Sequence, residues 1–149
     1  MPPTDHAAQA ARTIAGECLA VRARVLGRAI TAVFDEELRP LGLTTPQLNL
    51  LVATERMGRP APGELGATLH LEKSTLSRNL RLMEEHGWLR REAGEDRRSH
   101  ALALTAAGRR LLVKALPAWT RAQERAAELL GGAGARALAS AGDRLFAGG

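Results

Sequence analysis

The residues with the clearest capacity for chemistry lie between positions 73 and 81. Seven side chains there offer positive charge or hydrogen bonds, namely Lys73, Ser74, Thr75, Ser77, Arg78, Asn79 and Arg81. At 100° per residue, the leucines and methionine at 76, 80 and 83 share one face of a helix, and most of these polar residues project from the other. Arginine can bond guanine bidentately, and Ser, Thr and Asn can reach base edges or phosphates. The pattern predicts a helix that contacts duplex DNA.

A second basic feature follows at the tip of a predicted hairpin. Residues 88–92 and 100–104 are predicted to be strands, and the segment between them is longer than a two-residue turn, so its tip should project. We expect Arg97 and Arg98 to enter an adjacent minor groove or bind phosphate. Asp96 is expected to hold Arg98 in position, because a carboxylate and a guanidinium two residues apart can pair across a bend.

The residues before position 73 predict the element that supports this helix. A short helix over about 62–69 is followed by a turn at His70 and Leu71, and the second helix should run from about Glu72 to His86. Histidine tolerates a left-handed backbone better than most non-glycine residues, and Gly87 suits the end of the helix. In such a helix-turn-helix, the second helix lies in the major groove of DNA and the first helix crosses the DNA backbone.

Longer helices are predicted on both sides of this unit. A broad apolar stripe predicts a helix from about Arg12 to Leu38, and Thr44 with Gln47 forms a capping box for a helix that turns positions 48, 51 and 52 inward. After the hairpin, a long helix should reach about Leu130 with a kink at Pro117, and a glycine-rich break should precede a last helix over 135–146. The stripes are wider than one small domain can cover, which favours packing on a second copy.

Bulk composition sets weaker bounds. The chain has 149 residues, a net charge of +5 and a pI near 10.9, which is typical of proteins with a polyanionic partner. Cys18 is the single cysteine, so an intramolecular disulfide is impossible and a reducing compartment is expected. No secretory signal and no apolar run of membrane-spanning length is visible, so we expect a cytoplasmic protein without a membrane partner.

The sequence does not favour an enzyme. The four histidines fall in no metal-ligand spacing, and the glycines at 131–134 are too few and in the wrong context to cradle phosphate. No nucleophile motif is present. We therefore expect no catalytic residues, no metal and no cofactor.

Several short motifs together resemble the MarR family of winged-helix transcriptional regulators, over about residues 14–130. They are residues 38–44 (LRPLGLT) with Gln47, 63–65 (GEL), 73–80 (KSTLSRNL), Glu84, 87–89 (GWL), Arg91, 96–98 (DRR) and 104–108 (LTAAG). The resemblance implies an obligate homodimer that binds a palindromic operator, usually as a repressor, and is released by a small molecule or an oxidant. Ala61 and His70 depart from a capping threonine and a turn glycine that are common in the family, which could alter the local geometry of the DNA-binding unit.

These observations predict a mainly α-helical fold with a small β-wing. We expect a flexible N-terminal arm over 1–11, a winged helix-turn-helix DNA-binding domain over 44–104, and a helical dimerisation region over 12–43 and 105–149. The predicted partners are double-stranded operator DNA and a second copy of the chain. The alternative is a winged-helix module that serves only protein contacts or dimerisation, without specific DNA binding.

The signal that releases DNA is predicted outside the central stretch. Some relatives sense hydroperoxides through a cysteine in the first helix, and Cys18 lies about two residues from that position; Arg22, one turn on, could lower its pKa. The chain has no tyrosine to steady a thiolate, and a buried structural cysteine is the competing interpretation. Other relatives bind phenolic or other aromatic acids between the dimer helices and the DNA unit, where arginines such as Arg22 or Arg28 would serve here.

Overall fold

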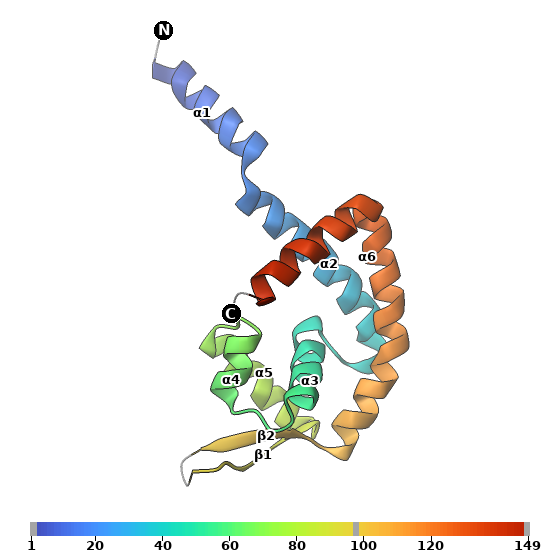
Figure 1. The fold of residues 1–149 in the computed structure, drawn as a ribbon. Helices are drawn as coiled ribbons and strands as arrows, with labels where there is room; N and C mark the ends of the chain where they lie inside the picture. The colour runs from blue at the N-terminus through green and yellow to red at the C-terminus, as the bar shows by residue number, and fades with distance from the viewer. Residues whose placement is uncertain (1–2, 97–98, 148–149) are drawn as a thin grey trace. The chain divides into compact units, whose positions relative to one another are not determined.

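The computed structural model describes residues 3–96 and 99–147, so Arg97 and Arg98 lie outside the described residues. The chain divides into two compact units, residues 1–32 and 33–149, with helix α2 (Leu19–Leu38) crossing the boundary. The described elements are mostly helices, with one two-stranded antiparallel sheet (Figure 1). This confirms the predicted fold class.

The first unit differs from the prediction in two places. Residues 3–11 were expected to form an arm without regular structure, but helix α1 runs over Pro3–Glu17. Proline suits a first helical position, and the four alanines among residues 7–11 are strong helix formers. The single helix expected over 12–38 is interrupted at Cys18, two residues after the weak helix former Gly16. The Arg22 guanidinium donates a hydrogen bond to the Gly16 carbonyl beside this break.

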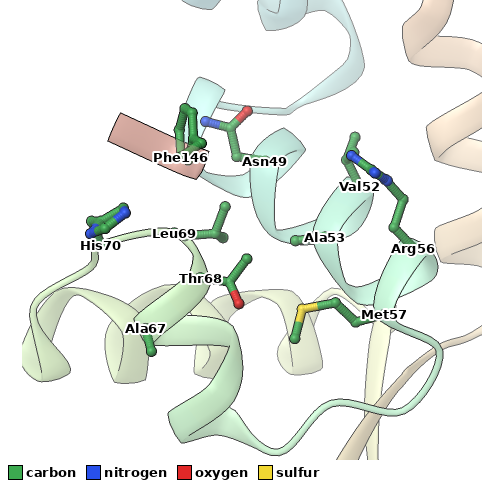
Figure 2. A pocket seen from close by; sticks show the side chains of 10 residues that line it. All are labelled: Asn49, Val52, Ala53, Arg56, Met57, Ala67, Thr68, Leu69, His70 and Phe146. Atoms are coloured by element: carbon green, nitrogen blue, oxygen red, sulfur yellow. The ribbon is translucent and has the colours of Figure 1, made fainter. Parts of the chain in front are cut away.

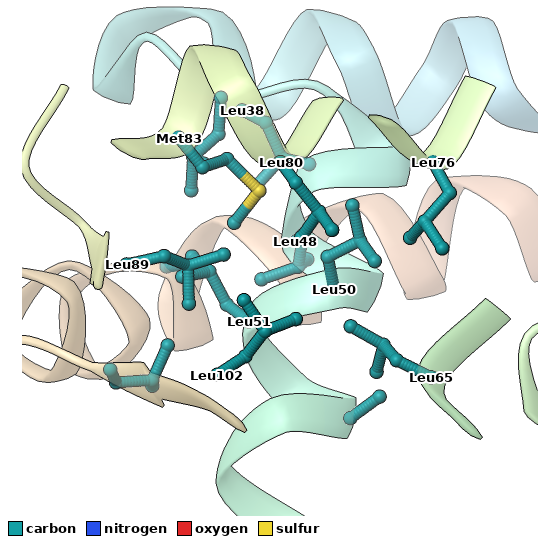
Figure 3. Packing of buried hydrophobic residues seen from close by; sticks show 14 of the residues in the cluster. Leu38, Leu48, Leu50, Leu51, Leu65, Leu76, Leu80, Met83, Leu89 and Leu102 are labelled. Atoms are coloured by element: carbon teal, nitrogen blue, oxygen red, sulfur yellow. The ribbon is translucent and has the colours of Figure 1, made fainter. Parts of the chain in front are cut away.

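The second unit is built around a core of leucines. Helices α3 (Thr45–Met57), α4 (Pro62–Thr68) and α5 (Lys73–Glu85) enclose it with the sheet and the first part of α6 (Ala106–Ala147). Figure 3 shows this cluster, whose fully buried members are Leu38, Leu50, Leu51, Leu65, Leu80, Met83, Leu102 and Leu104. Burial of these side chains removes apolar surface from water, which is the main term that stabilises the unit.

The start of α3 forms as predicted. The Gln47 backbone N–H donates to Thr44 Oγ1 (3.4 Å), and the Thr44 N–H donates to Gln47 Oε1 (3.1 Å). Asp35 of α2 adds an acceptor for the Thr45 backbone N–H (2.7 Å). The inward assignment of Val52 was wrong, because Val52 is 38% exposed whereas Leu50 is fully buried. The buried face of α3 is rotated towards position 50, since α4, α5 and β2 all pack against this helix.

The end of α5 explains where the sheet begins. The Gly87 N–H donates to the Glu84 carbonyl and the Trp88 N–H to the Met83 carbonyl, which is the Schellman arrangement, and Gly87 has φ 72°. Trp88 therefore closes the helix, and strand β1 (Leu89–Ala93) starts one residue later than predicted. It pairs with β2 (His100–Leu104) in antiparallel register, with Leu89 opposite Leu104.

The sheet is tied to the elements on either side of it. The Leu102 N–H donates to the Pro60 carbonyl, so the segment before α4 lies along β2 (2.9 Å). Thr105 caps α6 by accepting from the Gly108 N–H (3.0 Å) and donates to the Gly87 carbonyl (2.6 Å). A β-carbon at Gly108 would overlap the Trp88 carbonyl, so only glycine permits this close approach.

Helix α6 is more continuous than predicted. The four-residue break expected over 131–134 is reduced to Gly131, whose φ of 69° and ψ of 158° are non-helical. Glycine adopts this conformation without steric cost, and the alanine-rich residues after it resume the helix. Pro117 lies inside the helix. Among the described residues, no helix combines the length and apolar character needed to cross a membrane.

Candidate nucleic-acid interface

Helix α5 has the two faces that the sequence predicts. Leu76, Leu80 and Met83 are buried against the core, at 6%, 1% and 0% exposure. On the opposite side the exposed candidates are Lys73, Ser74, Ser77, Arg78 and Arg81, and Thr75 and Asn79 are half-buried beside them. The structure therefore brings the seven candidates of this segment onto one helix whose position the core fixes.

Asn79 differs from its neighbours because it is already engaged. Its side-chain Nδ2 donates to the Thr75 carbonyl at 3.0 Å, one turn earlier on the same helix. This bond holds the amide along the helix. A base contact by Asn79 would use the side-chain oxygen or require the amide to rotate.

Close packing between α4 and α5 sets the position of the recognition face. A β-carbon on Gly66 would lie 2.9 Å from Leu76 Cδ2, so a larger residue would have to displace the Leu76 side chain. The turn between them has His70 at φ 51°, which confirms the predicted left-handed residue. The Leu71 N–H then donates to the Gly66 carbonyl at 2.9 Å, which closes the turn. The departure from a turn glycine is therefore accommodated here.

The start of α4 uses half of a capping box. Ala61 has no side chain that could bond the helix, as the sequence indicates, but its backbone N–H donates to Glu64 Oε2 at 2.8 Å. Pro62 follows at the first helical position, where a backbone N–H would have no partner within the helix, so its absence in proline costs nothing. The helix thus begins at the predicted residue despite the missing threonine.

The positive charges of this surface fall into two groups. Within the described part of the chain, Lys73 and Arg78 have no carboxylate partner, and Arg81 has only a loose one in Glu85 (3.6 Å). On β1, by contrast, Arg90 binds Glu92 at 2.6 Å and Arg91 binds Glu84 at 2.8 Å. The charges on α5 are therefore the more available to an external anion.

Glu92 forms salt bridges with two arginines. It binds Arg90 and also Arg59 from the loop before α4, the latter at 2.7 Å. The hydrogen bond from Arg90 is the main cause that lowers the pKa of the Glu92 carboxyl, and the charge of Arg59 adds to it, while partial desolvation opposes both. The end of β1 nearest the hairpin tip is thus joined to the loop by charge-assisted hydrogen bonds.

The tip of the hairpin is described only up to Asp96 and again from Ser99. The Asp96 N–H donates to Ser99 Oγ, and Ser99 Oγ donates to the Asp96 carbonyl, both at 3.0 Å. A β-carbon on Gly94 would overlap Ser99, so glycine permits this turn. The predicted Asp96–Arg98 pair and the predicted DNA contacts of Arg97 and Arg98 lie outside the described residues.

The predicted effector residues lie in the first unit. Cys18 is a half-buried free thiol at the break between α1 and α2. Arg28 is exposed, and the Arg22 guanidinium bonds the Gly16 carbonyl. No group of three potential metal ligands occurs among the described residues.

The second unit holds a cavity that sequence reasoning missed. It has a volume of about 750 Å³ and lies between α3, the end of α4 and the last turn of α6, where Phe146 contributes one wall (Figure 2). Its lining includes Arg56 and His70, and neither Arg22 nor Arg28 belongs to it. No sequence pattern links residues 49–57 to Phe146, because only the reversal at Gly131 brings the end of α6 to this place.

The fold and the exposed face of α5 define a winged helix-turn-helix protein of the DNA-binding class. The sequence profile of the MarR family matches residues 41–99. A DNA complex of the Mycobacterium tuberculosis transcriptional regulator MosR is 34% identical, with a TM-score of 0.73, over 88% of this chain and 98% of that one. The chain belongs to the MarR family of transcriptional regulators, which are not enzymes.

Two further relatives are similar over different spans. The transcriptional repressor CouR, bound to a 23-mer DNA duplex, is 28% identical with a TM-score of 0.78, over 89% of this chain and 94% of that one. The uncharacterised HTH-type transcriptional regulator YwoH of Bacillus subtilis (strain 168) is 33% identical over 78 residues, which are 52% of this chain. That match spans 57% of the length of the Bacillus protein.

Proposed function

We propose that this MarR-family regulator is a repressor that binds a palindromic operator as a homodimer and is released by a small-molecule or oxidant signal. The observation that carries the DNA contact is the exposed face of α5, on which Lys73 and Arg78 have no carboxylate partner among the described residues. MosR and CouR, both similar over most of this chain, were solved with DNA.

The proposed contacts divide by task. The side chains on the first turns of α5, Ser74, Ser77 and Arg78, would lie deepest in the major groove and contact base edges. Lys73, Thr75, Asn79 and Arg81 would contact phosphates or flanking bases. The hairpin tip with Asp96, Arg97 and Arg98 would reach the adjacent minor groove or the backbone.

The proposed homodimer is supported by apolar surface that each unit leaves exposed. In the first unit these residues include Ile14, Leu19, Val21, Val25 and Leu26. In the second unit they include Val113, Leu116, Trp119, Leu129 and Leu145. Many exposed large apolar side chains on a protein favour an interface with a partner if they form a patch. Residues 12–43 and 105–149 would form the dimer layer, and 44–104 the DNA-binding domain.

A two-fold axis explains why the operator should be palindromic. Two copies of α5 related by that axis would enter major grooves about one DNA turn apart, roughly 34 Å, on inverted half-sites. A regulator held over a promoter in this way would block transcription. The releasing signal would then act by favouring a dimer whose recognition helices no longer match the half-site spacing.

The test measures the affinity of the protein for DNA upstream of its own gene. Fluorescence anisotropy gives this affinity at several salt concentrations. We expect the protein to bind one duplex tightly and a duplex of shuffled sequence weakly. Its affinity should fall steeply as the salt concentration rises. Analytical ultracentrifugation should give a dimer alone and one dimer per operator. Weak binding that is equal on both duplexes would instead favour a winged-helix module that serves only protein contacts.

A further inference from the structure

The last turn of α2 is fixed to the helix-turn-helix unit. Leu38 is fully buried in the leucine core. The Asp35 carboxylate accepts hydrogen bonds from Thr45 at the start of α3, at 2.7 Å from the backbone N–H and 2.6 Å from the hydroxyl. Only a short 3-10 turn over Arg39–Leu41 and three further residues separate the two helices. The end of α2 and the start of α3 therefore move together.

Helix α6 has a weak point just after the part that packs on this core. Ala115 and Ala118 are buried against the core cluster. Pro117 lies between them and has no backbone N–H, so the hydrogen bond to the carbonyl four residues earlier cannot form. The Thr120 hydroxyl donates to the Leu116 carbonyl at 3.0 Å, a contact that often bends helices. The direction of α6 beyond Pro117 is therefore weakly determined by its own backbone.

Four charged side chains join α6 to the end of α2 directly after this weak point. Arg121 donates to Glu37 at 2.8 Å, and Arg125 donates to Glu37 at 2.8 Å and to Glu36 at 2.7 Å. The Glu37 side chain is only 17% exposed, so its pairs are screened less than pairs in open solvent. The hydrogen bond from Arg125 is the main cause that lowers the pKa of the Glu37 carboxyl, and the bond from Arg121 adds to it. We call these four residues the ion-pair network.

The geometry of the ion-pair network restricts both the rotation and the direction of α6. Arg121 and Arg125 lie one helical turn apart on the same face of α6. Because their partners are two consecutive residues of α2, a shift of either helix lengthens at least one of the three pairs. The segment held in this way ends at the non-helical Gly131. It carries exposed Leu129, and Trp119 lies at its start, which are both part of the proposed dimer surface.

We propose that the ion-pair network fixes the direction of α6 relative to the helix-turn-helix unit and thereby sets the half-site spacing that the dimer accepts. Its members are positioning residues, because they act through the placement of α5 and are assigned no DNA contact. The consequence for spacing rests on the proposed function, since it requires a homodimer on an operator. Exposed ion pairs contribute little to stability, so the main effect falls on the direction of α6 and not on folding.

The first test measures the direction of α6 without DNA. Spin labels are attached at Ser77→Cys on α5 and Gln123→Cys on α6, both exposed positions, in a Cys18→Ser background that leaves no other thiol. Excess unlabelled protein is added so that each measured distance lies within one chain. Pulsed electron paramagnetic resonance gives the distribution of distances between the two labels.

The variant Glu36→Gln/Glu37→Gln removes all three ion pairs and should broaden or shift this distribution. The matched control is Glu124→Gln/Glu128→Gln, which changes the charge equally on exposed positions of α6 for which the structure describes no ion pair. The control should leave the distribution unchanged. Thermal melting verifies that both variants fold. A distribution that is the same in Glu36→Gln/Glu37→Gln and in the wild type overturns the proposal.

The second test measures affinity for the operator and for duplexes with one base pair added or removed between the half-sites. One base pair rotates a half-site by about a tenth of a turn, so the wild type and the control should lose affinity steeply. In Glu36→Gln/Glu37→Gln the ratio of affinities for native and altered spacing should fall about fivefold, as expected for the loss of exposed ion pairs. A base-pair change inside a half-site should cost the same in all three proteins, because α5 itself is intact.

The outcomes separate the ion-pair network from the proposed function. A broadened label distribution together with no sequence-selective DNA binding by the wild type would contradict the proposed function and leave the positioning of α6 intact. Selective operator binding with an unchanged label distribution would overturn the positioning alone. If Glu36→Gln/Glu37→Gln weakened binding equally at every spacing, the network would be merely structural and its role in spacing would be wrong.

Discussion

Helix α5 and strand β1 are consecutive, contacting elements that both carry arginines, yet their arginines are used differently. On β1, Arg90 and Arg91 bind glutamates at 2.6 and 2.8 Å. On α5, Lys73 and Arg78 have no carboxylate partner among the described residues. The comparison teaches that a count of basic residues does not locate an anion-binding surface. Partners decide which charges hold the fold together and which remain available to DNA.

The largest expected effect concerns the buried face of α5 rather than its exposed face. Leu80→Ala leaves a cavity in the core, and it should lower the free energy of unfolding by about 2–5 kcal/mol. Chemical denaturation measures this change, with Ser77→Ala on the exposed face as the control. A loss smaller than that of the control would contradict the assignment of the two faces.

The next prediction compares an arginine of α5 with an arginine of β1 in their contribution to operator affinity. Arg78→Ala should weaken operator binding by about 1–3 kcal/mol and relax sequence choice, because the side chain is assigned to a base. Arg91→Ala should change operator affinity little, because its guanidinium is held by Glu84. Fluorescence anisotropy on the operator and on a shuffled duplex compares the two variants. Equal losses in both would remove the distinction between the two groups of arginines.

The hairpin tip is expected to behave as a phosphate contact. Arg98→Ala should weaken binding to all sequences alike, and the slope of log affinity against log salt should fall by about one. The measurement is a salt titration on the operator and on the shuffled duplex. If affinity were untouched on both duplexes, the proposed role of the tip in DNA binding would be wrong.

The smallest effect concerns Glu92, which lies near the tip end of strand β1. Because the pKa of Glu92 is lowered in the folded protein, its contribution to stability is present above its ordinary pKa of 4.5 and is lost as pH falls through the lowered value. Glu92→Gln should therefore reduce stability slightly at pH 7 and flatten the acid side of the pH–stability curve. Thermal melting between pH 3 and pH 7 measures both effects. Identical pH dependence in wild type and variant would show that the pairing contributes nothing.

The sequence predicts the helix-turn-helix well because its local signals agree with its packing. The capping box at Thr44 and Gln47, the left-handed turn at His70 and the glycine at 87 each restrict the backbone by themselves. The periodicity of Leu76, Leu80 and Met83 then orients α5 without further information. Agreement between local preference and the global fold is what makes such a segment predictable.

Other features depend on contacts that no local pattern shows. Val52 was assigned to the core, but the neighbours of α3 select a face on which Leu50 is buried instead. Helix α1 was missed for a different reason, because its alanine propensity is a local signal that the two early prolines obscured. The pairing of Arg90 and Arg91 requires knowledge of which glutamates lie across from them. The cavity at Arg56 depends on Phe146, ninety residues away in the sequence.

The most direct test of the central claim is a coupling measurement between Arg78 and the operator sequence. Affinities are measured for wild type, Arg78→Ala and Arg91→Ala on the operator and on duplexes with single base-pair changes in each half-site. The account predicts that one base-pair position loses its effect in Arg78→Ala, and that every position keeps its effect in Arg91→Ala. Full discrimination by Arg78→Ala at every position would contradict the claim that the exposed face of α5 reads DNA.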